Sequence, residues 1–386
     1  MKKTIIHVVG ARPNFMKIAP IFVAIENQKN INNTLSIDQY IVHTGQHYGK
    51  EMSESFFSDL GIPDPHFNLN VGSGSHAFQT ANIMLSFERV LNELSPDLVI
   101  VVGDVNSTVA CAITAKKQGI RVAHVESGLR SFDRSMPEEI NRILTDSISD
   151  LLFTSEQSAN INLNNEGISS DKIYFVGNTM IDSLVRQLKN AAQVNTLKNI
   201  NLSGSGSDPF KYSLLTMHRP ANVDSPAVLS GFLETFSSLS DNIPILFPAH
   251  PRTIKQIKEN KLESLFCSSD EILFNKKGMV LIDPLGYYDM LNLMRSAYYV
   301  ITDSGGIQEE TTYLGIPCFT IRENTERPVT IDLGTNILIG HNRKLLFDEV
   351  SKITSGKHKK GTIPPLWDGK ASERIVDTLT SSLYSR

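Results

Sequence analysis

The stretch that decides the fold is Thr302-Asp303-Ser304-Gly305-Gly306-Ile307-Gln308-Glu309-Glu310, which follows an apolar, strand-like run at residues 297–301 and opens a helix-like segment. A strand, a turn of small residues and a helix start together form an anion site, because free backbone N–H groups and the positive end of the helix dipole converge there. Glu309 and Glu310 follow one to two turns into the helix, where a carboxylate can bind sugar hydroxyls. The stretch therefore predicts a nucleotide-diphosphate site with a ribose contact, although an ordinary Asp-capped turn between a strand and a helix shows the same pattern.

Outward from this turn, strand-like and helix-like segments alternate in two blocks. The apolar runs are continuous, which is typical of parallel sheets buried on both faces. In the first block we expect strands at residues 4–9, 40–43, 98–102, 121–125, 151–154 and 173–176, and helices at 15–26, 51–60, 76–94, 107–118, 137–149 and 158–167. In the second block we expect strands at 212–217, 244–248, 279–282, 298–301 and 317–321. This alternation predicts an α/β fold with two doubly wound, Rossmann-like domains.

A polar segment separates the two blocks and ends in Ser203-Gly204-Ser205-Gly206-Ser207-Asp208-Pro209, which is typical of an exposed link. We therefore expect a first domain at residues 1–189, a linker at 190–211 and a second domain at 212–366. An amphipathic segment at 371–383 predicts a terminal helix within residues 367–386. Tandem doubly wound domains leave a cleft that the carboxyl ends of their strands face.

Composition limits the function classes. The chain has 386 residues, 40% of them hydrophobic and 20% charged, which suits two globular domains. A net charge of −4 without a basic block argues against a nucleic-acid surface. Cys111, Cys267 and Cys318 form no metal or redox spacing, so we expect buried free thiols. No apolar run is long enough for a signal peptide or a membrane span, and we expect a soluble, cytoplasmic protein.

Charged residues gather where strands of the first block end. Arg12 and Lys17 follow the first strand, and a guanidinium fork with an ammonium group suits phosphate. Asp104 and Glu126 lie at the ends of two further strands, and Glu138 opens a helix. Each acid alone fits a helix cap or a helix start. Three acids in one cleft repel one another and shift one another's pKa, which favours a chemical role.

In the second block, His218 and Arg219 end the first strand, at the position equivalent to Arg12. A lone histidine is usually structural, but a histidine beside an arginine and opposite acids can serve as a general acid or stabilise charge. For His250, at the next strand end, a structural role is favoured. The glycine pattern at residues 72–77 lacks a good preceding strand, so we do not expect NAD, and no motif predicts a metal site.

Together these motifs resemble the non-hydrolysing UDP-N-acetylglucosamine 2-epimerases of bacteria. The matching motifs run in order along nearly the whole chain, at residues 10–13, 102–104, 124–130, 137–139, 177–179, 218–219, 303–310 and 325–328. The resemblance implies a GT-B arrangement of two domains facing a cleft, with the helix at 367–386 crossing back to the first domain. It also implies a homodimer.

The resemblance implies elimination of UDP from C1, formation of 2-acetamidoglucal and re-addition of UDP after protonation on the other face. On this interpretation Asp104, Glu126 and Glu138 are catalytic carboxylates, with the base among them left open, and His218 acts beside the diphosphate. The substrate-binding residues would be Arg12, Lys17, Arg219, Ser304, Gly305, Gly306, Glu310 and Arg327. The resemblance implies a UDP-sugar as the partner, with no cofactor, no metal, no nucleic acid and no membrane.

Departures from the family pattern leave more than one substrate open. Pro220-Ala221 and the segment 72–76 replace residues that help form a second, activating substrate site in many members. The segments 72–76 and 136–139 also resemble enzymes that act on UDP-2,3-diacetamido uronic acids, whereas 325–328 and 177–179 favour the N-acetylglucosamine enzymes. We expect the latter, in polysaccharide synthesis for an envelope or capsule. A hydrolysing epimerase, a GT-B glycosyltransferase and a non-catalytic UDP-sugar sensor also stay open, and a sensor would not need three carboxylates.

Overall fold

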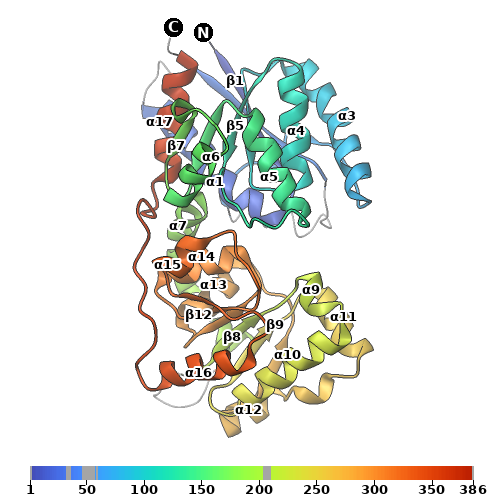
Figure 1. The fold of residues 1–386 in the computed structure, drawn as a ribbon, viewed down its shortest axis with the longest axis vertical. Helices are drawn as coiled ribbons and strands as arrows, with labels where there is room; N and C mark the ends of the chain where they lie inside the picture. Colours follow the sequence, from blue (N-terminus) through green and yellow to red (C-terminus); the bar gives the residue numbers. More distant parts are fainter. Residues whose placement is uncertain (1, 32–35, 46–56, 58–59, 203–209, 385–386) are drawn as a thin grey trace. The chain divides into compact units, whose positions relative to one another are not determined.

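The computed structural model describes residues 2–384 except 32–35, 46–56, 58–59 and 203–209. The chain forms two compact units, and Figure 1 draws them in colours that follow the sequence. Unit 1 comprises Met1–Leu184 with Pro365–Arg386, and unit 2 comprises Val185–Pro364. Most of the predicted helix at 51–60 and of the glycine-rich end of the predicted linker lies outside the described residues. The linker as a whole stays a prediction, since helix α7 (Thr179–Gln193) runs past its expected start.

Unit 1 is built on a parallel sheet. Its strands are β1 (Lys3–Val9), β2 (Ile37–His43), β3 (Phe67–Asn68), β4 (Leu98–Val102), β5 (Arg121–Val125), β6 (Leu151–Thr154) and β7 (Ile173–Phe175). They lie in the order β3-β2-β1-β4-β5-β6-β7, and every neighbouring pair is parallel. The order reverses between β1 and β4. That reversal is the topological switch point, where loops diverge from the carboxyl edge and ligands bind in doubly wound folds.

Helices cover both faces of this sheet, and they are α1 (Arg12–Ile31), α3 (His76–Leu94), α4 (Asn106–Lys117), α5 (Pro137–Ile148), α6 (Gln157–Asn165), the start of α7 and α17 (Ala371–Tyr384). On one face, Phe87 and Leu91 of α3 join Val99 and Val101 of β4 in a hydrophobic core. On the other face, α17 contacts α1. Apolar side chains at helical spacing produce these buried stripes.

Although α17 comes last in the chain, it is fastened to unit 1. Asp182 accepts hydrogen bonds from the backbone N–H groups of Ala371, at 3.1 Å, and Ser372, at 2.6 Å. The indole Nε1–H of the buried Trp367 donates to the carbonyl of Ser155 at 2.9 Å. The two bonds to Asp182 satisfy backbone amides that the start of α17 would leave unpaired. In Figure 1 the red helix α17 lies among the blue and green elements of unit 1.

Unit 2 repeats the same topology with six parallel strands, β8 (Ser213–Thr216), β9 (Ile245–Pro248), β10 (Met279–Ile282), β11 (Val300–Thr302), β12 (Cys318–Thr320) and β13 (Asn336–Leu338). Their order is β10-β9-β8-β11-β12-β13, so the switch point lies between β8 and β11. The strand β13 was not predicted, and neither was β3 in unit 1. Both span only two or three residues, too few for a periodic signal.

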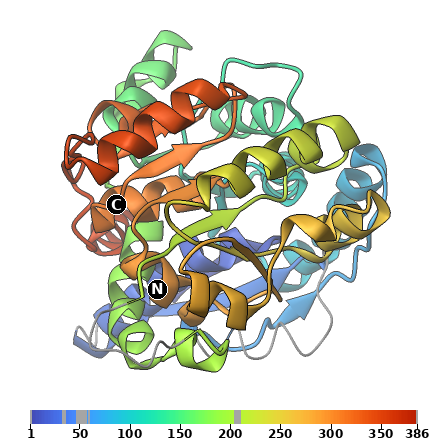
Figure 2. The same ribbon diagram turned by 90° about the horizontal axis from the view of Figure 1, so that it is seen from below.

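The helices of unit 2 are α8 (Thr196–Asn199), α9 (Pro220–Val223), α10 (Pro226–Leu239), α11 (Pro251–Glu259), α12 (Ser269–Asn275), α13 (Tyr287–Ser296), α14 (Gly305–Leu314), α15 (Pro328–Asp332) and α16 (Arg343–Thr354). Proline stands in the first turn of α10 and α11. The backbone N–H groups of a first helical turn have no intrahelical acceptor, so the N–H that proline lacks costs no hydrogen bond there. Figure 2 shows α10 and α16 over one face of the sheet, and their apolar residues belong to one core with β8 and β9. Within the described ranges, no helix has the length and apolarity needed to cross a membrane.

Candidate functional site

The first group of candidate residues lies at the switch point of unit 1. Asn14 connects the two loops there, because its Oδ1 accepts from Ala11 N at 2.8 Å and its Nδ2 donates to the Val102 carbonyl at 3.0 Å. The turn after β1 is therefore fixed to the end of β4. Arg12 begins α1 at this turn. Its side chain lies outside the described part of the structure, so its binding role stays a prediction.

Glu126 lies at the end of β5 and forms an ion pair with Lys17 of α1. Both residues are buried. Glu126 also has a backbone φ of +68°, a left-handed conformation that is rare outside glycine and costs about 1–3 kcal/mol. Such strain persists where the surrounding structure holds it, and it gathers at functional sites. The structure thus brings two predicted residues from different elements into contact.

Asp104 lies two residues after the end of β4 and is held by an arginine of α5. Its Oδ2 lies 2.5 Å from Arg142 Nη1, and Arg142 Nη2 lies 2.6 Å from Glu139 Oε2. Gly103 before it has a φ of +69°, which a residue with a side chain adopts only under strain. Glu138 lies half-buried in the first turn of the same helix α5. Arg142 therefore links the predicted Asp104 to the helix that carries the predicted Glu138.

Glu139 is a structural residue that sequence reasoning left without a role. Its carboxylate accepts from the backbone N–H of Ser131 at 3.0 Å and of Phe132 at 2.9 Å. Burial alone would raise the pKa of Glu139, but these hydrogen bonds and Arg142 lower it below the ordinary value. Glu139 and Arg142 are three residues apart on one helix, and this spacing of opposite charges is the signal that could have identified the pair.

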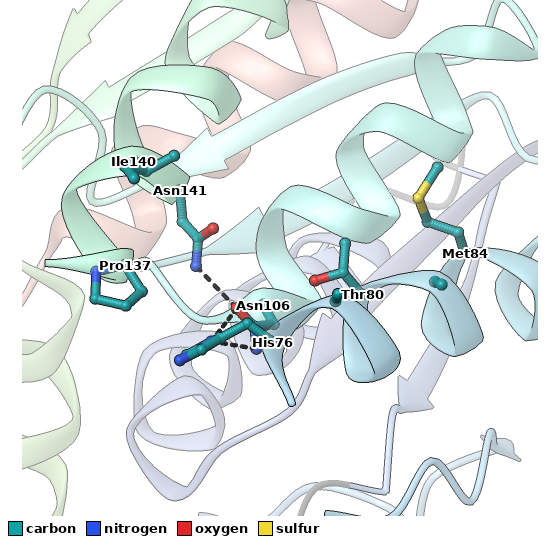
Figure 3. Close-up of a pocket in the computed structure, with 9 residues that line it drawn as sticks. His76, Thr80, Met84, Asn106, Pro137, Ile140 and Asn141 are labelled. Carbon is teal, nitrogen blue, oxygen red and sulfur yellow. Dashed lines mark hydrogen bonds between the residues drawn. The ribbon is translucent and has the colours of Figure 1, made fainter. Parts of the chain in front are cut away.

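A pocket of about 400 Å³ lies beside this assembly, between α3 and the starts of α4 and α5. Figure 3 shows Asn106 between His76 and Asn141 on its polar side. Asn141 Nδ2 donates to the Asp104 carbonyl at 2.9 Å, so the pocket touches the backbone of a predicted catalytic residue. The rest of the lining is mostly apolar, from Ala77, Ala81, Met84 and Ile140.

The second group lies at the switch point of unit 2 and is organised by Asp303. This residue is 0% exposed, and its Oδ2 accepts from His218 N at 3.0 Å and Arg219 N at 2.8 Å. His218 Nδ1 lies 3.0 Å from Asp303 Oδ1. Burial would raise the pKa of Asp303, but His218 and these N–H groups lower it. The carboxylate therefore holds the loop after β8 against the end of β11.

The start of α14 has the features of an anion site. Ser304 is its N-cap residue and its side chain makes no capping hydrogen bond. Gly305 and Gly306 form the first turn, where backbone N–H groups have no intrahelical acceptor. A side chain at Gly305 would collide with Arg327, whose Nη1 lies 2.7 Å from the position of a Cβ atom there. Arg327 thus lies against this turn, and its predicted role in substrate binding stays a prediction.

The arginines around this turn are balanced by buried acids. Arg327 pairs with Glu326 and with Glu309, whose Oε1 lies 2.8 Å from its Nε. Arg322 Nη2 lies 2.8 Å from Glu326 Oε2. Burial would raise the pKa of Glu326, but the two arginines lower it well below its usual range. Arg219 donates from Nε to the Asp303 carbonyl at 3.0 Å, and burial lowers its pKa.

Glu310, the predicted ribose carboxylate, is buried one to two turns into α14. The hydroxyl of Tyr287, at the start of α13, donates to its Oε1 at 2.8 Å. No feature of the sequence indicated this tyrosine, because the contact joins two helices of different strand crossovers. Among the described residues, no group of three or more His, Cys, Asp or Glu side chains is placed to hold a metal ion.

Comparisons with known proteins cover the whole chain. A family model described as UDP-N-acetylglucosamine 2-epimerase matches residues 29–380. The chain is 42% identical over 386 residues to the UDP-N-acetylglucosamine 2-epimerase of Methanocaldococcus jannaschii, and all of both sequences is covered. It is 37% identical over 378 residues to the UDP-2,3-diacetamido-2,3-dideoxy-D-glucuronate 2-epimerase of Pseudomonas aeruginosa, covering 97% of this chain and 99% of that protein. The crystal structure of the M. jannaschii UDP-GlcNAc 2-epimerase in complex with UDP-GlcNAc and UDP matches with a TM-score of 0.84 and 41% identity, covering 98% of this chain and 99% of that one.

Proposed function

This chain belongs to the UDP-N-acetylglucosamine 2-epimerase family, and we propose that it interconverts UDP-N-acetylglucosamine and UDP-N-acetylmannosamine without a net loss of UDP. The C2–H bond of the sugar has no neighbouring carbonyl to acidify it. We therefore propose that inversion at C2 proceeds by elimination, as the family resemblance implies: a base takes the C2 proton, the C1–O bond breaks, UDP leaves and 2-acetamidoglucal forms. A proton then reaches C2 from the opposite face, and the UDP oxygen adds back to C1.

The observation that carries this proposal is the carboxylate assembly of unit 1. Glu126 is paired with Lys17, Asp104 with Arg142, and Glu138 lies on the helix that supplies Arg142. Proton removal and return on two faces of one carbon require more than one acid–base group. We assign Asp104, Glu126 and Glu138 to these transfers. A sensor or a transporter of UDP-sugars gains nothing from such a set.

Unit 2 provides the proposed binding site for UDP, which is the leaving group. We assign the diphosphate to Ser304, Gly305 and Gly306 at the start of α14, together with His218 and Arg219. Fixed N–H groups and cations favour the charge that develops on UDP as the C1–O bond breaks. Glu310 binds the ribose hydroxyls, and Arg327 supports the turn at Gly305. Arg12 and Lys17 are the proposed cations of unit 1.

One alternative substrate has direct support. The similarity to the P. aeruginosa diacetamido-glucuronate epimerase extends over 97% of this chain. The reaction at C2 is the same in both cases, and the substrates differ at C3, which carries an acetamido group instead of a hydroxyl, and at C6, which is a carboxylate instead of a hydroxymethyl group. We rank UDP-N-acetylglucosamine first because the relative at 42% identity carries that name.

We further propose that the protein is a cytoplasmic homodimer that supplies polysaccharide synthesis. Leu85 of α3 is 62% exposed, and Ile140 and Leu144 of α5 are 47% and 45% exposed. Ile140 and Leu144 are four residues apart, so they share one helix face beside the pocket of Figure 3. Exposed apolar side chains on these two helices suit contact with a second copy of the chain. Light scattering of the wild type and of Leu144→Glu tests this: a dimer that the variant splits supports it, and a monomeric wild type contradicts it.

Proton NMR of the purified protein with UDP-N-acetylglucosamine in D₂O tests the reaction. Deuterium at C2 together with a UDP-N-acetylmannosamine signal is the expected result. Free N-acetylmannosamine with UDP would instead show a hydrolysing enzyme. If UDP-N-acetylglucosamine does not exchange while the UDP-2,3-diacetamido uronate does, the alternative substrate is correct. UDP binding without exchange of either sugar would identify a sensor.

A further inference from the structure

A buried histidine, His124, lies behind the carboxylate loops and has no part in the reaction proposed above. It is 0% exposed and lies on β5, two residues before Glu126. Its Nδ1 lies 2.6 Å from Asp146 Oδ1, and its Nε2 lies 2.8 Å from the carbonyl oxygen of Gly103. A carbonyl oxygen accepts and never donates, so Nε2 must carry a hydrogen. The same holds for Nδ1 if Asp146 is ionised.

The surroundings of Asp146 indicate that it is ionised. Its Oδ2 lies 2.7 Å from Arg130 Nη1 and accepts from the backbone N–H of Gly128 at 3.0 Å. Burial would raise the pKa of Asp146, but His124 and Arg130 lower it below the ordinary carboxylate value. Arg130 Nη2 also lies 2.6 Å from Glu166 Oε2, so the guanidinium contacts two carboxylates. With both ring nitrogens facing acceptors, His124 is doubly protonated.

His124 and its two hydrogen-bond partners, Gly103 and Asp146, each lie on or beside an element that leads to a proposed catalytic carboxylate. Gly103 precedes Asp104, and its left-handed backbone is held by the bond to His124. Asp146 lies on helix α5, which carries Glu138 in its first turn. His124 itself is on the strand that ends in Glu126. One imidazolium therefore connects β4, β5 and α5 from inside the unit.

We propose that His124 is held as a buried imidazolium and is a positioning residue that fixes the placement of Asp104, Glu126 and Glu138 for proton transfer at C2. The inference rests on the proposed epimerase function. A misplacement of catalytic groups by about 1 Å can reduce a rate by about 100-fold without changing substrate binding. The neutral ring has one N–H group, so it would lose either the bond to Asp146 or the bond to Gly103.

His124→Gln tests the proposal, with His7→Gln as a matched control. His7 is also 0% exposed in the sheet of unit 1, but its ring bonds to Gln39, at 2.7 Å, and not to a catalytic loop. Both variants should lower the melting temperature. Only His124→Gln should reduce kcat for epimerisation, by about 100-fold, with KM and the Kd for UDP within about twofold of the wild type. If both variants reduce kcat alike, or if neither does, His124 is only a core residue.

Nitrogen NMR of histidine-labelled wild-type protein tests the charge state without any substitution. Under the conditions of the epimerase assay the His124 ring should show two protonated nitrogens, because both face hydrogen-bond acceptors, whereas the His7 ring, whose pKa burial lowers to about 4, should be neutral. A neutral His124 ring under those conditions would overturn the proposal. This measurement needs no turnover. A wild type that fails to exchange the C2 proton of any UDP-sugar therefore refutes the proposed function, and the ring signals separately decide the state of His124.

Discussion

The two sheets have the same strand order, but the residues at their switch points differ in charge and in the way they are held. In unit 1 the loops after β4 and β5 present Asp104, which pairs with Arg142, and Glu126, which pairs with Lys17. In unit 2 the loops after β8 and β11 present His218 and Arg219 around the start of α14, all held by one buried carboxylate, Asp303. The shared topology supplies an edge where loops diverge. The side chains then decide whether that edge transfers protons or holds an anion.

The largest expected effect separates these two roles. Glu126→Gln removes an acid–base group from unit 1 and should reduce kcat by about 1,000-fold. The Kd for UDP, measured by calorimetry, should stay within about twofold of the wild type, because most of the proposed UDP contacts lie in unit 2 and the variant keeps Lys17. Turnover that survives in this variant would remove Glu126 from the proposed chemistry.

The next largest effect tests whether the Asp303 carboxylate holds the loop after β8 in place. Asp303→Asn places an amide against the N–H groups of His218 and Arg219 and should lower the free energy of unfolding by about 3 kcal/mol. Urea denaturation measures this change. Asp270→Asn is the control, because Asp270 is an exposed residue of the same unit and its replacement should cost under about 1 kcal/mol. Equal stability of the two variants would mean that Asp303 does not organise the loop.

A third prediction concerns how the stability of the protein depends on pH, through a buried histidine of unit 1. Burial lowers the pKa of His7 from 6.5 to about 4, so the fold favours its neutral form. This contribution to stability is complete above pH 6.5 and is lost as the pH falls towards 4, by about 2 kcal/mol at pH 5. The difference in unfolding free energy between the wild type and His7→Gln should therefore narrow between pH 7 and pH 5. A constant difference would contradict a neutral buried His7.

The smallest effect concerns the nucleotide grip itself. Glu310→Gln should weaken UDP binding by about tenfold, because it replaces the proposed charged acceptor of the ribose hydroxyls. Tyr287→Phe removes only the hydroxyl that orients Glu310 and should weaken binding by about threefold. Tyr288→Phe is the control, since that hydroxyl donates to Gln187 at 2.9 Å. A loss of affinity in Tyr288→Phe equal to that in Tyr287→Phe would show that the effect is not specific to Glu310.

Much of the fold was predictable because buried parallel strands leave long apolar runs, and the runs at β4 and β5 were predicted with the observed bounds. The short strands β3 and β13 were not predicted. They are defined by hydrogen bonds to β2 and β12 and not by a sequence pattern of their own. The start of the helix after Thr302 was predicted from its glycines and its preceding strand.

At the two sites, sequence patterns located candidate residues but did not predict the hydrogen bonds and ion pairs that hold them in place. The motif at 137–142 contains two adjacent glutamates. Only the folded chain shows that Glu139 accepts hydrogen bonds from the backbone N–H groups of Ser131 and Phe132. The contact of His124 with Asp146 joins a strand to the following helix and has no local signal. Such pairs depend on tertiary packing, and one sequence carries no record of it.

The position of α17 has a consequence for biosynthesis. Its residues Ile375 and Leu379 are buried against unit 1, yet they are translated after every residue of unit 2. During synthesis the ribosome therefore completes unit 2 first, while unit 1, though begun earlier, still exposes the apolar face that α17 will cover. A chain truncated after Pro364 would hold an entire second unit and an unfinished first one. A nonsense mutation near the end of the gene should thus damage the half of the protein encoded at its beginning.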